Sequence, residues 1–195
     1  MPKLTSEEID QLLSTAGLVR VGTVNADGSP SVVPVGYLYR DGRILLTARE
    51  RVNWLTNIRR DPRVCLVIDD TRYPLTKVTI NGSATIEYEP GRDDEWRDLR
   101  LPLADRYTTG PSSLEEEWTE EWSYDAAYRL ITHDEPRALV AVALDGADVT
   151  SWRLPIEGEY VDESWARRYY RNEPRRFRVV QSGKRMRDVR VVLEE

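Results

Sequence analysis

The chain has 195 residues, of which 40% are hydrophobic and 32% charged, and a formal net charge of −6 at pH 7. This composition is typical of a soluble globular protein with a heavily charged surface. The one cysteine excludes a disulfide framework within the chain, and together with the one histidine it cannot form a zinc site of ordinary ligand count. No apolar run reaches membrane-spanning length and the N-terminus is acidic, so we expect a cytoplasmic protein without a signal peptide or membrane contact.

The charge is unevenly distributed along the chain. Residues 165–195 contain ten Lys and Arg against four Asp and Glu, whereas the rest of the chain is strongly acidic. A basic tail can bind nucleic acid, but the net acidity and the absence of a recognition motif argue against that partner. The interpretation that we favour is that the basic segment packs on the acidic surface of its own chain or of a second subunit.

Alternating apolar residues and turn-forming residues divide the chain into short elements. Thr5 and Glu8 have the spacing of a capping box, which predicts a helix that ends near Gly17. Alternation and short apolar runs predict strands at residues 18–24, 31–39, 44–47, 64–68, 77–88, 138–144 and 149–154. Asp41–Gly42 predicts a hairpin turn between the second and third of these strands, and a further hairpin is predicted across 177–193. The strand 149–154 is expected to pair with 138–144 across the Asp145–Gly146 turn. Residues 90–133 lack strand alternation, and their pattern predicts one or two helices and a long loop.

The most informative stretch runs from Ile44 to Asp69. A short apolar strand leads into a basic corner at residues 47–51, and a short helix ended by Asp61–Pro62 follows. The spacing of Trp54, Leu55 and Ile58 places these residues on one face of that helix. A helix N-terminus next to guanidinium groups favours an anion, so the corner is a candidate phosphate site. The alternative is a solvated turn whose arginines only keep the protein soluble. The strand before it contains Pro34 and Gly36, which suit a strand edge that meets a bulge or a ligand.

Residue motifs point to no catalytic side chain. The sequence has no phosphate-binding glycine loop, no dinucleotide fingerprint and no nucleophile elbow. Catalytic residues are therefore unknown and no metal site is expected. If the protein is an enzyme, the difficult chemical step belongs to a bound cofactor.

Three segments together resemble a known superfamily. LVRVGTVNADGSPSVVPVGYLYRDGRILLT, NIRRDPRVCLVIDD and KVTINGSATIEYEP are similar to the pyridoxamine 5'-phosphate oxidase-like flavin-binding proteins, which include deazaflavin-dependent relatives. The resemblance covers about residues 5 to 90, and ALVAVALDGADVTSW resembles a later strand of that fold. It implies a mainly β protein with peripheral helices, built on an antiparallel six-stranded split β-barrel. We expect the barrel domain at residues 1–155 with an insertion at about 90–135, and a basic extension at 156–195.

The same resemblance implies a homodimer with FMN in grooves at the interface and a small organic substrate. The implied cofactor-binding residues fall into three groups. One group lies along the flavin ring, one meets the phosphate from the corner and the helix start, and one approaches from the neighbouring strand. They are Val33, Pro34 and Val35; Thr47, Arg49, Arg51, Val52, Asn53 and Trp54; and Lys77 and Thr79. Members of the family commonly carry a phosphate-binding lysine where this chain has Trp54. Arginines can take over that charge through bidentate contacts, and the indole can stack on a ring or fill the core.

These observations predict an FMN-dependent oxidoreductase of this group. Two alternatives stay open, namely a reductase that uses coenzyme F-420 and a split-barrel protein that binds flavin or haem without turnover. The chain has no Arg-x-His near its C-terminus, which pyridoxamine-phosphate oxidases use to hold substrate, so that particular activity is not expected.

Overall fold

The computed structural model describes residues 2–72, 74–99, 102–103, 135–154, 160–162, 177–181 and 188–193. Most of the region in which helices were expected after residue 90, and the expected helix near Trp165, lie outside this part. The elements are α1 (Ser6–Thr15), β1 (Leu18–Val24), β2 (Pro30–Arg40), β3 (Arg43–Arg49), α2 (Asn53–Arg60), β4 (Arg63–Asp70), β5 (Thr76–Tyr88), the 3₁₀ helix η1 (Asp93–Trp96), β6 (Arg137–Ala143), β7 (Asp148–Arg153), β8 (Tyr160–Asp162), β9 (Phe177–Gln181) and β10 (Asp188–Leu193). No helix in these ranges is long and apolar enough to cross a membrane.

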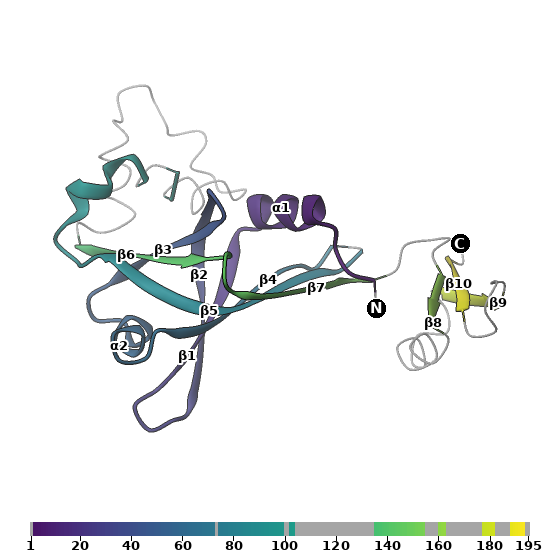
Figure 1. The fold of residues 1–195 in the computed structure, drawn as a ribbon, viewed down its shortest axis with the longest axis horizontal. Helices are drawn as coiled ribbons and strands as arrows, with labels where there is room; N and C mark the ends of the chain where they lie inside the picture. Colours follow the sequence, from purple (N-terminus) through teal and green to yellow (C-terminus); the bar gives the residue numbers. More distant parts are fainter. Residues whose placement is uncertain are drawn as a thin grey trace, which may run out of the picture. The chain divides into compact units, whose positions relative to one another are not determined.

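The large sheet closes on itself. Its strand order is β4-β1-β2-β3-β6-β5-β7, and β4 also pairs with β5, so six antiparallel strands form a barrel and β7 extends it (Figure 1). This confirms the predicted mainly β fold and the six-stranded barrel. The alternation on which the prediction rested is visible in β1, where Val19, Val21 and Thr23 are buried and the residues between them are not.

The predicted pairing of residues 149–154 with 138–144 is wrong. Both edges of β6 are occupied, one by β3 and the other by β5, so β7 lies next to β5 instead. The Asp145–Gly146 turn is present, with Gly146 at a φ of 74°. The turn therefore connects two strands that are consecutive in sequence but do not pair as a hairpin, which such a turn usually closes. The reason is that β3 and β5 occupy both edges of β6.

The hairpin between β2 and β3 follows directly from local sequence. Arg40 pairs with Arg43, and the two residues between them, Asp41 and Gly42, have φ angles of 52° and 68°. Two successive positive φ values define the two-residue turn that matches strand twist, and Asp-Gly is one of the residue pairs that favour it. The predicted C-terminal hairpin is likewise confirmed, since β9 and β10 pair from Phe177–Leu193 to Gln181–Val189.

The chain divides into two compact units. Residues 13–68 and 79–150 make up the larger unit, whose core contains the fully buried side chains of Leu45, Leu66 and Leu139. In that unit the buried Tyr37 hydroxyl donates a hydrogen bond to the Leu13 carbonyl over 2.7 Å. Residues 1–12, 69–78 and 151–195 make up the smaller unit, which includes a sheet of order β8-β10-β9. The predicted boundary at residue 155 and the docking of the basic extension stay predictions.

Candidate functional site

The predicted flavin strand lies where two barrel strands separate. Register between β2 and β3 extends from Arg40–Arg43 to Tyr37–Leu46 and ends there, although both strands continue. Beyond that point residues 30–36 of β2 pair with β1, and residues 47–49 of β3 pair with β6. The exposed Pro34 has no N–H to contribute to a ladder, so it suits such a strand. Val33, Pro34 and Val35 thus flank one side of the separation, and Thr47 and Arg49 flank the other.

The basic corner contains a three-residue ion cluster. Arg49 Nε lies 3.2 Å from one carboxylate oxygen of Glu135, and Arg51 Nε lies 3.3 Å from the other. The side chain of Arg51 is exposed, whereas those of Arg49 and Glu135 are partly covered. Register places Arg137 directly opposite Arg49 on β6. The corner therefore brings three arginines to neighbouring backbone positions, and a single carboxylate bridges two of them.

The helix that leaves this corner begins without a side-chain cap. Val52 is the N-cap residue of α2, and its side chain makes no capping hydrogen bond. Asn53, the first helical residue, is exposed. Backbone N–H groups at an uncapped helix start carry a partial positive charge and favour an anion. The predicted residues Arg49, Arg51, Val52 and Asn53 are thus consecutive parts of one electropositive turn.

Trp54 fills the core of the larger unit. Its side chain is only 6% exposed, and on the same face of α2 Leu55 is fully buried and Ile58 is 3% exposed. These are the three residues whose spacing predicted the buried face of the helix. Of the two roles left open for the indole, the structure therefore supports core packing. The position that faces solvent at the helix start is Asn53.

A polar network joins α2 to the turn between β1 and β2. The buried Asn57 amide donates to the Thr23 hydroxyl over 3.0 Å and to the Asn25 side-chain oxygen over 2.9 Å. Arg60 donates to the Val24 carbonyl. Figure 1 shows α2 lying against β1, which these bonds require. The network holds the helix, and hence the electropositive turn at its start, in a set position on the barrel.

Neighbouring charges on the helix are already neutralised. Arg59 forms a two-bond pair with Glu50, and it also contacts Glu89. The hydrogen bonds from Arg59 lower the pKa of Glu50, and those to Glu50 and Glu89 raise the pKa of Arg59. At the other end of α2, hydrogen bonds from Arg63 lower the pKa of Asp61 to about 2. Glu50 and Asp61 are therefore ionised at neutral pH, so their partners Arg59 and Arg63 offer less charge to a ligand than the corner arginines do.

The two predicted residues of β5 differ in their surroundings. Lys77 belongs to the smaller unit, where its ammonium lies 5.5 Å from the centroid of the Trp152 ring, within cation–π range. Thr79 belongs to the larger unit and is half-buried. Their predicted approach to a cofactor stays a prediction.

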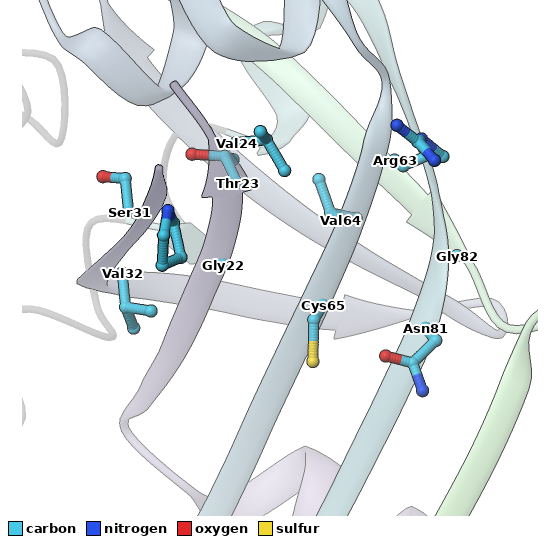
Figure 2. A pocket seen from close by; sticks show the side chains of 11 residues that line it. Gly22, Thr23, Val24, Ser31, Val32, Arg63, Val64, Cys65, Asn81 and Gly82 are labelled. Atoms are coloured by element: carbon cyan, nitrogen blue, oxygen red, sulfur yellow. The ribbon is translucent and has the colours of Figure 1, made fainter. Parts of the chain in front are cut away.

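A separate groove of about 590 Å³ lies on the outer face of the barrel (Figure 2). Val32, Gly22 and Cys65 are aligned across β2, β1 and β4 at its centre. Gly22 allows β1 and β4 to approach closely here, because a Cβ atom at this position would lie 3.0 Å from the Cys65 carbonyl oxygen. None of the predicted cofactor residues lines the groove, whose lining residues are Gly22, Thr23, Val24, Pro30, Ser31, Val32, Arg63, Val64, Cys65, Asn81 and Gly82.

The model of the pyridoxamine 5'-phosphate oxidase family matches residues 5–142, which is most of the chain. The chain belongs to this family. The match includes the strand separation, the electropositive turn and α2, and it extends the earlier resemblance through β6. No curated protein sequence matches the chain.

Several solved structures share the fold. A conserved hypothetical protein from Mycobacterium tuberculosis is 24% identical with a TM-score of 0.60, and the alignment covers 80% of this chain and 92% of that one. An FAD-binding protein from Mesorhizobium loti is 17% identical with a TM-score of 0.55, covering 79% and 98%. The haem storage protein of Vibrio cholerae is 13% identical with a TM-score of 0.52, covering 74% and 94%. At these identities the likeness establishes the fold of this chain and nothing more.

Sequence reasoning missed two residues of the site. Glu135 lies in the segment before β6, more than eighty residues from the arginines that it bridges, and only the β3–β6 register brings it to them. Pro136 offered a local signal, since it favours an extended backbone at Glu135 as the chain enters the strand. Asn57 was missed because a polar residue in a short helix is usually exposed.

Proposed function

We propose that the protein is an FMN-dependent oxidoreductase that acts on a small organic substrate. The observation that carries this proposal is the paired Arg49 and Arg51 at the uncapped start of α2, beside the separation of β2 and β3. Guanidinium groups and free helix N–H groups are the donors that a phosphate monoester requires. Bound FMN would supply hydride and electron transfer, for which the chain has no side chain of its own.

The protein's residues would bind and orient this cofactor. Arg49 and Arg51 would hold the phosphate, and the backbone of Val33–Val35 would lie along the flavin ring, as the resemblance implies. Asn57 would fix the turn by holding α2 on the barrel. A flavin is compatible with this fold, because the FAD-binding protein from Mesorhizobium loti shares it.

A carrier that binds flavin without turnover is the second candidate. The buried Trp54 at the position of the family's lysine favours it, because the phosphate loses one cationic partner. The two candidates predict different behaviour of the reduced holoprotein. An oxidoreductase reoxidises faster than free reduced FMN when a quinone or nitro compound is added without oxygen, whereas a carrier does not.

The phosphate contact is tested by replacing both corner arginines with alanine. We expect the FMN dissociation constant of Arg49→Ala/Arg51→Ala to rise about 10- to 100-fold, since a hydrogen bond to a charged group contributes about 1.5–3 kcal/mol. Riboflavin lacks the phosphate, so its affinity should not change. Both constants are measured by titration with flavin fluorescence. Coenzyme F-420 is titrated in parallel.

The matched control is Arg40→Ala/Arg92→Ala, which removes the same charge from exposed arginines paired with Asp41 and Glu95. This control should bind FMN as the native protein does. Equal losses in both double variants would mean that only net charge matters and would contradict the assignment of the corner. Tight binding of F-420 with no binding of FMN would move the protein to the deazaflavin-dependent alternative.

We further propose that a second copy of the chain covers the outer face of the barrel around the groove. Val32 is 65% exposed there, and Leu18 and Val24 are 47% and 38% exposed on the adjoining strand. Isolated exposed apolar residues are ordinary, but a contiguous apolar groove on a sheet face is typical of an interaction surface. The groove also adjoins the strand segment proposed to contact the flavin, which is consistent with a cofactor bound near a subunit interface.

Light scattering after size-exclusion chromatography tests this dimer. The native protein should elute at twice the chain mass of 22.6 kDa, and Val32→Asp should elute as a monomer because it buries an unpaired charge in the interface. Thr56→Asp, an exposed substitution on α2, is the control that should stay dimeric. A monomeric native protein would contradict the proposal.

A further inference from the structure

We infer that Glu135 sets the affinity and charge preference of the corner by occupying the anion position when no ligand is bound. This inference rests on the proposed function, because it concerns the same phosphate site. Its two carboxylate oxygens are divided between two cations: one lies 3.2 Å from Arg49 Nε and the other 3.3 Å from Arg51 Nε. A second donor of Arg51, Nη2, lies 3.4 Å from the oxygen that faces Arg49.

The position of Glu135 is a consequence of the fold. Arg49 and Arg137 are directly opposite in the β3–β6 ladder, which places two like charges on the same face of the sheet. Glu135 lies two residues before Arg137, just beyond the end of the ladder, and its side chain is 23% exposed. Pro136 favours an extended backbone at the preceding residue, so Glu135 lies on the same face as Arg137, the face that carries Arg49.

A bound phosphate would share the two corner arginines with Glu135. Both Nε atoms lie within 3.3 Å of the carboxylate, and a dianion next to that carboxylate would be repelled at this separation. Phosphate binding therefore requires Glu135 to leave at least one arginine. It follows that a dianion is favoured over a monoanion. A monoanion carries the same charge as the Glu135 carboxylate that it displaces, so it gains little attraction to the arginines.

The inference differs from a purely structural role for the pair. If Glu135 pre-organised the arginines for the ligand, removing its charge would weaken phosphate binding. If it competes with the ligand, the same change strengthens binding. Glu135→Gln separates these outcomes, because glutamine keeps the size and one acceptor oxygen but lacks the negative charge.

The experiment measures FMN and riboflavin dissociation constants for the native protein, Glu135→Gln and Glu50→Gln. We expect FMN to bind Glu135→Gln about fivefold to tenfold more tightly, with riboflavin unchanged. Glu50→Gln removes the same charge from the connection between β3 and α2 that also carries Arg51, but its carboxylate is paired with Arg59, so its effect on FMN should be about twofold or less. Thermal unfolding of the same proteins is followed in inorganic pyrophosphate.

The outcomes separate this inference from the proposed function. If the native protein binds FMN and Glu135→Gln binds it equally or more weakly, the inference is overturned while the proposed function stands. If no variant binds any flavin, the proposed function falls. Pyrophosphate then decides the inference: stabilisation of Glu135→Gln beyond that of the native protein supports it, and equal or absent stabilisation overturns it.

Discussion

Replacing Trp54 with alanine is expected to lower the free energy of unfolding by about 3–5 kcal/mol. The indole is 6% exposed on the buried face of α2, so the substitution removes apolar contacts and leaves a cavity between the helix and the barrel. Such a loss is a large part of the stability of an ordinary domain, which is about 5–15 kcal/mol. Equilibrium unfolding in urea, followed by circular dichroism, measures it.

Two further tryptophan variants separate packing from cofactor binding. Trp152→Ala should cost less, since that ring is half-buried in β7. Trp54→Phe retains most of the apolar volume and should leave FMN affinity unchanged. A stable Trp54→Phe protein that loses FMN binding would show that the indole contacts the cofactor, contrary to its placement in the core.

Replacing Asn57 with aspartate is expected to cost about 3 kcal/mol of stability at neutral pH. The amide nitrogen of Asn57 donates to Thr23 and Asn25, and a carboxylate of the same shape can donate to neither. The substitution therefore buries a charge that faces the Asn25 oxygen and removes the main link between α2 and the β1–β2 turn. Urea unfolding again measures the change.

Asn53→Asp is the matched control for this substitution. It introduces the same charge on the same helix, at an exposed first position where a carboxylate interacts favourably with the helix dipole. The control should be as stable as the native protein. If both variants were equally stable, Asn57 would have no role in positioning the helix.

Local sequence was sufficient for most of the barrel strands and their turns. Alternation predicted β1 and β4 because one face of each strand is buried, and Asp41–Gly42 predicted a hairpin because the turn requires positive φ angles. The spacing of Trp54, Leu55 and Ile58 predicted the buried face of α2, and the structure places all three in the core. These features depend on residues that are close in sequence.

Strand partners were less predictable. The turn at Asp145–Gly146 resembled a hairpin turn, yet β7 lies next to β5, because β3 and β5 occupy both edges of β6. Which edge remains available depends on strands that are remote in sequence. A local turn motif carries no information about that competition.

The sequence by itself determined the mainly β fold, the family and the concentration of arginines at the start of α2. Only the tertiary structure decided which carboxylate pairs with those arginines, because the β3–β6 ladder brings Glu135 next to Arg49 and Arg51. Burial of the indole likewise depends on how α2 packs against β1. Residue type and spacing fix the local conformation, whereas the charge available to a ligand depends on which carboxylates the fold brings within reach.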